Sequence, residues 1–317
     1  MSLTPEQLEL RRGKVMASDV AAYLGFHPWV KPFEAWARNL GLETFEEEEN
    51  ESMELGTLLE RPLLELAARR IGMSDAAFGC PTMFRPDVPW AGATPDALGA
   101  HNGIQCKVSG LHMARDYQGL PGETGRFDND AIPIYHLLQC QWEMLVTQRP
   151  LWHLAVYFGG RDFRIYALSY DSDLVGSMRA AAQVFWREHL DENGPQRRPE
   201  LDGSDAAMAF LRKTYPRNKG NLTEPTAEAL ALAQRYREAD AKLKEWEAAK
   251  AEAKHKLCDL VGASDGIAEV CTWKKTNPKP RTDWESLAKA LEGWDALLPD
   301  HTITPEGVRT FRLTLKE

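Results

Sequence analysis

Apolar residues recur at helical spacing in three stretches near the start of the chain. Glu6–Leu24 is predicted to form a helix that ends at the turn beginning with Gly25, and Pro32–Leu40 is predicted to form a second helix. Met53–Ile71 has the most regular spacing, and Gly72 follows it as a stop signal. We expect its buried face to consist of Leu55, Leu58, Leu59, Leu63, Leu66 and Ala67.

Shorter apolar runs of extended character follow, and turn residues separate them. Arg115–Asp130 contains several Gly and Asp residues and is predicted to be a loop. The predicted strands are Thr82–Arg85, Trp90–Thr94, Gly103–Val108, Trp152–Phe158 and Phe163–Ser169, and the predicted helices among them are Tyr135–Thr147 and Asp173–Leu190. This alternation predicts an α/β fold with a central mixed β-sheet flanked by helices.

The polar, turn-rich segment Arg197–Glu224 separates this core from the rest of the chain. We therefore expect a core domain over residues 1–222 and a C-terminal extension over residues 223–317. Pro225–Val261 is predicted to be one long helix. Beyond it, we expect strands at Ala268–Lys274 and Val308–Lys316 around a helix at Asp283–Leu298, which would form a small α/β region.

The apolar residues of this long helix keep a spacing of four and three, interrupted only at Lys250. Such spacing favours a coiled-coil or helical-hairpin seam. A helix that packs on its own domain has the same pattern, so an intermolecular and an intramolecular role are equally compatible with it. The seam consists of Leu232, Tyr236, Ala239, Leu243, Trp246, Ala253, Leu257 and Leu260.

The charge of the chain is acidic overall but unevenly distributed. A net charge of -9 over 317 residues opposes binding to nucleic acid. Acidic residues gather in the run Glu46–Glu49, whereas basic residues form short clusters, so an enclosed basic channel inside an acidic exterior would fit the composition. Ordinary solvated charges would fit it too, and composition alone favours them. The clusters are Arg11-Arg12-Gly13-Lys14, Arg197-Arg198, Arg212–Asn221 and Lys274–Arg281.

Cysteine spacing and hydropathy exclude several classes of protein. The five cysteines are scattered and form no CxxC pair, which argues against a disulfide framework, a structural zinc site and an iron–sulfur cluster. We find no apolar run long enough to span a bilayer, and the first residues lack an apolar signal segment. We therefore expect a cytoplasmic protein with no membrane partner.

The segment Trp90–Ser109 carries the most informative polar residues. A predicted strand leads into a Thr-Pro-Asp sequence that ends at Asp96, and a second predicted strand contains Gln105 and Lys107. Side chains two positions apart on a strand share a face, so Gln105 and Lys107 point the same way, beside Asp96 if the strands pair. With Glu in place of Gln105, this would be the PD-(D/E)xK arrangement of nucleases.

The chemistry of that arrangement explains its residue types. Two carboxylates hold Mg²⁺ through hard oxygen atoms, and the metal makes a bound water a better nucleophile and stabilises charge on the phosphate. The lysine orients or deprotonates this water. A short pattern of this kind is common by chance, and two surface strands with unrelated polar residues would also produce it, so the segment needs support from the rest of the chain.

Three further segments occur in the order and spacing of a known family. They are Leu10–Asp19, Met53–Pro62 and Tyr135–Thr147, and two predicted strands follow the last of them. With Trp90–Ser109, they make about the first two-thirds of the chain similar to the lambda-type (YqaJ-like) phage exonucleases of the PD-(D/E)xK superfamily. Four motifs in the same order argue against a chance resemblance.

The resemblance implies roles for individual residues. Arg11 and Ser18 would bind the terminal 5′-phosphate of DNA, although alone they are equally typical of a solvated charge and a helix cap. Glu60 would face the metal, although an acid beside apolar neighbours is usually a boundary residue. Gln141 would lie near the metal and phosphate. The supporting positions are Gln139 and Thr94.

The resemblance also implies a cofactor, an activity and partners. Mg²⁺, with Mn²⁺ as a substitute, would be held by Asp96, Gln105, Glu60 and the backbone carbonyl of Cys106, and the catalytic set would be completed by Lys107 and Gln141. The activity would be 5′→3′ exonuclease cleavage of double-stranded DNA, which leaves a 3′ single strand for phage-type homologous recombination. Double-stranded DNA ends, further copies of the chain in a ring-shaped trimer and a single-strand annealing protein would be the partners.

Gln105 is a departure from the family pattern, which has glutamate at this position. An amide offers a metal one neutral oxygen but no second negative charge. Either a substitution engineered to trap a complex or natural divergence towards a weak or inactive nuclease would explain it. Because the other motif residues are in place, we favour an engineered, inactivated variant.

Two other functions are compatible with these residues. A structure-specific or restriction-like endonuclease would share the core, but it has no strand end for Arg11 and Ser18 to hold. A catalytically inactive DNA-binding or scaffold protein would fit Gln105. The complete remaining set argues against this second alternative: Glu60, Asp96, Lys107 and Gln141.

Overall fold

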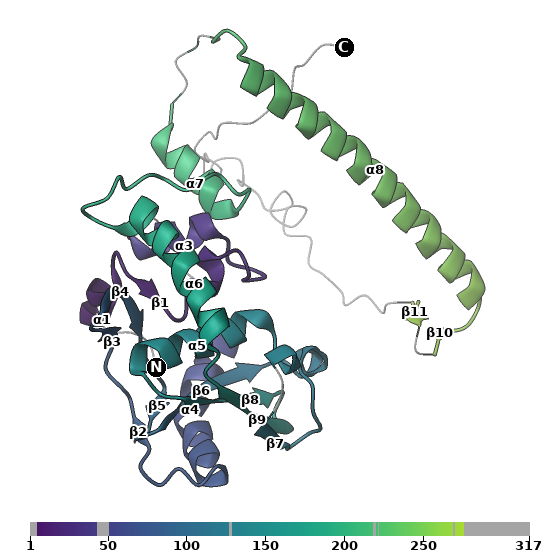
Figure 1. Ribbon diagram of the computed structural model, residues 1–317. Coiled ribbons are helices and arrows are strands. Elements are labelled where there is room, and N and C mark those ends of the chain that lie inside the picture. The colour runs from purple at the N-terminus through teal and green to yellow at the C-terminus, as the bar shows by residue number, and fades with distance from the viewer. Residues whose placement is uncertain are drawn as a thin grey trace, which may run out of the picture. The chain divides into compact units, whose positions relative to one another are not determined.

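The computed structural model describes residues 5–42, 51–126, 129–217, 220, 222–268 and 270–275, and the chain divides into two units (Figure 1). The first unit is Met1–Thr214 and the second is Tyr215–Glu317. The expected boundary after residue 222 falls inside the second unit. The acidic run Glu46–Glu49 and the expected elements Asp283–Leu298 and Val308–Lys316 lie outside the described residues.

A six-stranded mixed sheet forms the centre of the first unit (Figure 1). Its strands in spatial order are β2 (Ala77–Phe78), β5 (Ala97–Leu98), β6 (Asn102–Ser109), β8 (Leu151–Phe158), β9 (Asp162–Ser169) and β7 (Thr124–Arg126). The β6–β8 and β7–β9 pairs are parallel, and the other neighbouring pairs are antiparallel. The predicted α/β class with a central mixed sheet is therefore confirmed.

Helices cover both faces of this sheet. On one face, α4 (Glu51–Arg70) packs with Leu63, Leu64 and Ala67 against Ile104 and Cys106 of β6. On the other face, α5 (Ile134–Thr147) packs against the alternate residues of β8 (Figure 1). The contacting side chains there include Leu137, Cys140, Met144, Trp152, Leu154 and Val156. Strand alternation thus sends Gln105 and Lys107 to the side of α5.

The buried face of α4 differs from the predicted one. Leu55 and Leu58 are exposed, whereas Leu64 and Ala68 are buried beside Leu63. The predicted stripe ran the whole length of the helix, but only its C-terminal half lies on the sheet. Helical spacing therefore identified the helix correctly and misplaced part of its apolar face.

A second, three-stranded sheet of order β1-β4-β3 contains β1 (Val15–Met16), β4 (Val88–Ala93) and β3 (Met83–Arg85). The prediction of one helix over Glu6–Leu24 is wrong, because the chain there forms α1 (Pro5–Arg11), β1 and α2 (Val20–Tyr23). Gly13 has a φ of 68°, which breaks the helix, and Val15 pairs in parallel with Ala91. The predicted helix at Pro32–Leu40 is confirmed as α3 (Pro32–Asn39).

Three further regions of the chain differ from the sequence-based assignment. β7 and the 3₁₀ helices η1 (Leu111–Asp116) and η2 (Asn129–Ala131) occupy the region around the predicted loop, and β7 pairs with β9. α7 (Asp205–Thr214) lies in the segment expected to be irregular. α6 (Ser172–Phe185) continues as a π-helix, η3 (Trp186–Leu190), so the predicted helix there spans two elements.

The second unit contains α8 (Ala227–Val261), followed by the small hairpin of β10 (Gly266–Ile267) and β11 (Cys271–Thr272). The Thr226 hydroxyl caps α8 by accepting a hydrogen bond from the Ala229 backbone N–H at 3.1 Å. Seven of the eight residues of the predicted seam are exposed, and Leu257 is half-buried. Of the helices that the structure describes, none is sufficiently long and apolar to span a membrane.

The close contact between Gly103 and the Trp152 ring makes a first prediction. A methyl group at Gly103 would overlap the six-membered ring of the fully buried Trp152, so Gly103→Ala should lower the free energy of unfolding by about 1–3 kcal/mol. Gly176→Ala, in exposed α6 with open space around it, is the matched control and should be neutral or raise stability by up to about 1 kcal/mol. Urea unfolding measures both, and equal stability of the two variants would contradict this packing.

Candidate active site

The Asp96 carboxylate lies directly before β5, at the point where β5 pairs with β6. The register Ala97 opposite Ile104 brings Asp96 beside the next residue of β6, Gln105. One oxygen, Asp96 Oδ2, accepts hydrogen bonds from the Cys106 backbone N–H at 2.7 Å and from Gln105 Nε2 at 2.5 Å. The expected pairing of the two strands around these residues is therefore present.

The side-chain amide of Gln105 has a defined orientation. Its Nε2 donates to Asp96 Oδ2 and also approaches the Cys106 carbonyl oxygen at 3.3 Å. Its Oε1 accepts from Gln139 Nε2 at 2.9 Å, and the same nitrogen donates to Glu143 Oε1 at 3.0 Å. Acceptors thus surround one end of the Gln105 amide and a donor meets the other. The amide nitrogen, not the oxygen, is directed at the two groups expected to bind metal.

Charged side chains from two other positions act on Asp96. Burial raises the pKa of Asp96 to about 6; the Lys107 charge lowers it and the Glu60 charge raises it. Glu60 is on α4, whereas Lys107 is two residues after Gln105 on β6. Asp96 is thus hydrogen-bonded to Gln105 and lies within electrostatic range of both Glu60 and Lys107.

Glu143 is a site residue that the sequence analysis missed. Its side chain is 1% exposed, and burial raises its pKa to about 8, with a further rise from the Asp96 charge. It follows Gln139 by four residues on α5, the spacing that puts two helix side chains on one face. An acid within this otherwise apolar stretch, four residues after a glutamine assigned to the site, was the available signal.

Gln139 contacts Gln105, whereas Gln141, which was expected near the metal and phosphate, has its partners elsewhere. Gln141 is fully buried, donates to the Ser169 carbonyl at 2.9 Å and accepts from the Asp171 backbone N–H at 3.0 Å. It ties α5 to the segment between β9 and α6. Residues two apart on a helix are separated by about 200° around the axis, so both glutamines cannot face one site.

Thr94 lies two residues before Asp96, and its hydroxyl is 2.9 Å from the Thr82 hydroxyl. This contact joins the end of β4 to the residue before β3. Thr94 thus contacts the residue that precedes a neighbouring strand. Its position is consistent with a supporting role behind Asp96 rather than a catalytic one.

The two residues expected to bind a 5′-phosphate are also brought together. Arg11 Nη2 donates to the Ser18 hydroxyl at 2.5 Å and lies 3.7 Å from an Asp19 carboxylate oxygen. Ser18 is exposed, and the residue that precedes α2 as its N-cap is Asp19. Burial lowers the pKa of His27, and the charges of Asp19 and Lys107 also act on it. His27 is therefore an electrostatic neighbour both of Asp19, which pairs with Arg11, and of Lys107.

The donor set suits a hard cation only in part. Carboxylates of Asp96 and Glu60 and the carbonyl of Cys106 offer the oxygen atoms that Mg²⁺ prefers. Gln105 presents its nitrogen to the same region. Among the residues that the structure describes, no group of three or more His, Cys, Asp and Glu side chains is arranged to hold a metal.

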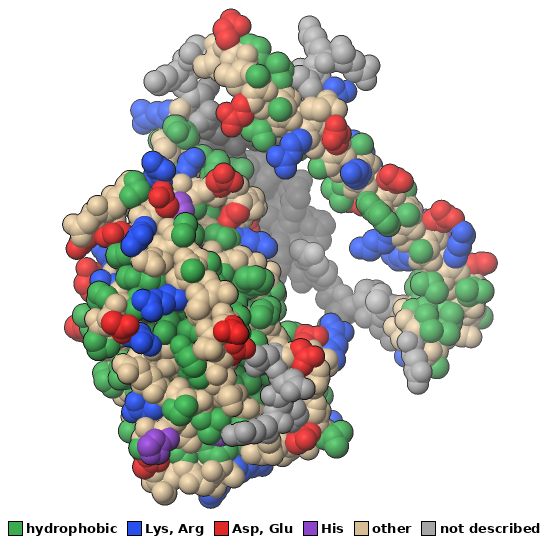
Figure 2. Space-filling view, viewed as in Figure 1, with side chains coloured by type: hydrophobic (Ala, Val, Ile, Leu, Met, Phe, Trp, Pro, Cys, Tyr) green, Lys and Arg blue, Asp and Glu red, His purple; other side chains and the backbone are tan. Residues whose placement is uncertain are grey.

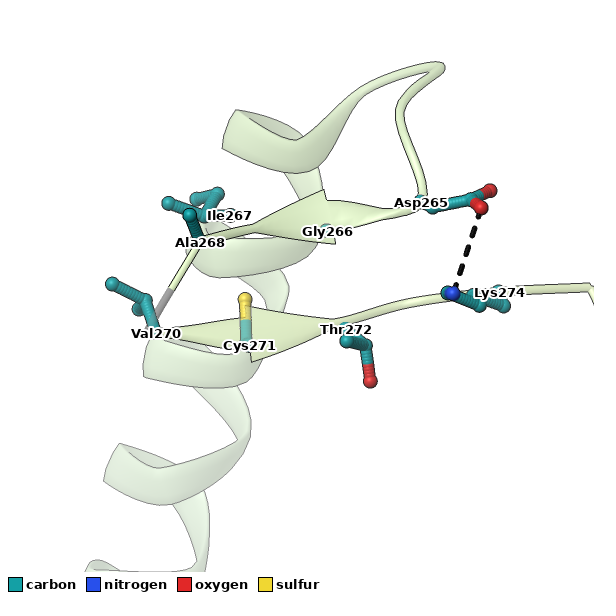
Figure 3. A pocket seen from close by; sticks show the side chains of 8 residues that line it. All are labelled: Asp265, Gly266, Ile267, Ala268, Val270, Cys271, Thr272 and Lys274. Atoms are coloured by element: carbon teal, nitrogen blue, oxygen red, sulfur yellow. Dashed lines mark ion pairs between the residues drawn. The ribbon is translucent and has the colours of Figure 1, made fainter.

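The face in Figure 2 shows acidic and basic side chains of the first unit interspersed, with no single large basic patch. A separate pocket lies in the second unit at the β10–β11 hairpin (Figure 3). There Asp265 and Lys274 face each other at 3.6 Å, while Ile267 and Val270 lie near the turn. This pocket holds one ion pair and small or apolar side chains, and its residues belong to none of the sequence motifs.

Comparison with known proteins gives one family match and one curated relative. Residues 6–150 match the model of the YqaJ-like viral recombinase domain family. The uncharacterized protein YqaJ of Bacillus subtilis is 25% identical over 281 residues, which cover 85% of this chain and 82% of that protein. At 85% coverage, the similarity must extend past residue 222, further than the first two-thirds of the chain.

Two solved structures are similar in part. An alkaline exonuclease (LHK-Exo) from Laribacter hongkongensis is 20% identical with a TM-score of 0.42, covering 57% of this chain and 90% of that one. A phage-related exonuclease from Haemophilus somnus is 13% identical with a TM-score of 0.41, covering 56% and 96%. The likeness to a family therefore rests on the sequence match over residues 6–150, a region that is similar to the YqaJ-like viral recombinase domain family.

Proposed function

We propose that this chain is a metal-dependent nuclease that degrades double-stranded DNA from its 5′ ends in phage-type recombination. The observation that carries the proposal is the Asp96 carboxylate held against β6 at the β5–β6 pair, with the charges of Lys107 and Glu60 acting on it. The similarity of residues 6–150 to a viral recombinase domain family supports a role at DNA ends. By family resemblance, we further propose a ring trimer, a single-strand annealing protein as partner and a location in the cytoplasm.

The carboxylates of Asp96 and Glu60 and the Cys106 carbonyl would hold Mg²⁺, or Mn²⁺ in its place. When bound, the ion would supply an activated water and offset charge on the phosphate. The Cys106 N–H holds Asp96 Oδ2 in place through a 2.7 Å hydrogen bond. Because burial raises the pKa of Asp96 to about 6, this carboxyl is ionised above that pH and able to bind a cation.

Lys107 would orient the attacking water and offset negative charge on the phosphate. It projects from the same face of β6 as Gln105 and is partly exposed, so its ammonium group is accessible from solvent. Burial raises the pKa of Asp96 and the Lys107 charge lowers it, which supports a place for this ammonium group near the carboxylate. An ammonium group there can orient a water and offset the negative charge that develops in the transition state.

Arg11 and Ser18 would select the strand end. A guanidinium group and a hydroxyl in hydrogen-bond contact can grip one phosphate together, since both offer donors to its oxygens. A terminal phosphate held there would set the direction of cleavage as 5′→3′. An endonuclease cleaves inside a strand, so its substrate would offer Arg11 and Ser18 no terminal phosphate.

A second candidate is a DNA-binding protein without turnover, and the orientation of Gln105 favours it. The amide nitrogen already satisfies Asp96 Oδ2 and supplies no charge. DNA binding would survive in such a protein, because Arg11, Ser18 and Lys107 do not depend on the identity of residue 105. The two candidates therefore differ in turnover rather than in affinity for DNA.

Gln105→Glu should raise the rate of DNA hydrolysis by about 10²–10⁴-fold, because it restores the negative charge that holds a metal beside Asp96. Lys107→Ala in that background should remove the gain. Single-turnover digestion of 5′-phosphorylated linear duplex in Mg²⁺ measures the rates, and binding in Ca²⁺ is measured separately. Equal cleavage by the chain and its Gln105→Glu form would contradict the metal role of this position, and binding without cleavage by both would favour the second candidate.

Arg11→Ala should slow digestion of a 5′-phosphorylated duplex by at least about tenfold more than that of a 5′-hydroxyl duplex. The Gln105→Glu background supplies measurable turnover. Arg12→Ala is the matched control, because Arg12 is the adjacent arginine and pairs with Glu9 at 3.4 Å rather than with Ser18. An equal effect of Arg11→Ala on both substrates would mean that Arg11 contacts the DNA backbone in general. The proposed 5′→3′ direction of cleavage would then have no support.

A further inference from the structure

The turn between α2 and α3 presents an aromatic group that the proposed chemistry does not use. Trp29 is 63% exposed. Its ring centroid lies 5.7 Å from His27 and 5.7 Å from Tyr135, both at 70° between planes, and the His27 and Tyr135 rings are 5.4 Å apart. The three rings thus contact one another pairwise, and the two neighbours support the Trp29 ring edge to face.

We propose that Trp29, supported by His27 and Tyr135, is a stacking platform for the terminal nucleobase of a DNA strand that enters the active site. The inference rests on the proposed function, since it names how that site would hold the end of its substrate. Base stacking on an aromatic side chain contributes about 1–3 kcal/mol and is tolerant of sequence, as an enzyme that degrades any DNA requires.

The platform adjoins the site through α5. Tyr135 precedes Gln139 by four residues, so the two side chains share one face of the helix. Gln139 donates to Gln105, and the Lys107 charge lowers the pKa of both His27 and His136, in each case after the larger effect of burial. One turn of α5 therefore separates Tyr135 from Gln139, the residue that contacts Gln105.

The turn is held in one conformation by its own hydrogen bonds. His27 Nδ1 accepts from the Val30 backbone N–H at 3.0 Å and from that of Trp29 at 3.4 Å. The backbone N–H groups of Phe26 and His27 both donate to the Ala21 carbonyl, at 2.8 and 3.1 Å. A ring presented on a fixed turn loses little conformational entropy when a base stacks on it.

The chemistry around the platform favours a nucleic acid as its occupant. The charges that act on His27 are one anion, Asp19, and two cations, Lys107 and Arg38; Arg11 is a further cation, paired with Asp19 at 3.7 Å. Phosphates need such cations, whereas an apolar partner surface would not. Phe26, 54% exposed on the same turn, adds a second aromatic side chain next to the platform.

The test compares equilibrium binding of two 5′-phosphorylated duplexes in Ca²⁺ by fluorescence anisotropy. They are identical except that one has abasic residues in place of the terminal base pairs. The unaltered chain should bind the abasic duplex about 5- to 100-fold more weakly. Trp29→Ala should weaken binding of the intact duplex by a similar factor and bind the two duplexes equally. Trp29→Phe should retain most of the discrimination.

Trp246→Ala is the matched control, because Trp246 is an exposed tryptophan on α8 in the second unit and should leave the discrimination unchanged. If the chain binds duplex DNA but Trp29→Ala still discriminates against abasic ends, the platform is overturned while the nuclease proposal stands. If no form of the chain binds duplex DNA, the proposed function itself fails. A change of oligomeric mass on Trp29→Ala, with unchanged DNA binding, would make this surface a contact between copies and also overturn the inference.

Discussion

The hydrogen bond between the Cys106 backbone N–H and Asp96 Oδ2 is the contact on which the rest of the site depends. It fixes the carboxylate against β6 and joins the residue before β5 to the strand that carries Gln105 and Lys107. The burial of this site raises the pKa of Asp96 to about 6, so nearby donors or a cation are needed to stabilise its ionised form. The proposed chemistry uses that need to bind a metal.

Gln105 meets the need of Asp96 in a different way. Its amide donates to Asp96 and is oriented from behind by Gln139, which in turn is held by Glu143. Two carboxyl groups thus terminate one chain of side-chain hydrogen bonds. A glutamate at position 105 could not donate to Asp96, and the mutual repulsion of two carboxylates would favour a bound cation. The local structure therefore depends on which of the two side chains occupies this strand position.

Strand periodicity predicted the central part of the site and helix periodicity predicted less of it. The spacing of Gln105 and Lys107 was sufficient to place both on one face, because the two-residue repeat of a strand has no ambiguity. Helix α5 required knowledge of which face meets the sheet; the resemblance implied a catalytic role for Gln141 and a supporting one for Gln139, but Gln139 is the residue that contacts Gln105. Glu143 was missed because an acid inside a helix is usually solvated. β1 escaped prediction because its pairing with β4 is a long-range contact.

Calorimetric titration of Mg²⁺ into the chain and into its Gln105→Glu variant, at about pH 7.5, tests the account most directly. This pH lies above the pKa of about 6 at Asp96, so proton competition at that carboxyl is small. The account predicts weak binding by the chain and at least about tenfold tighter binding by the variant, because the variant adds a charged oxygen ligand. Tight binding by the chain itself, or equal affinity of the two forms, would contradict the central role of the Gln105 amide.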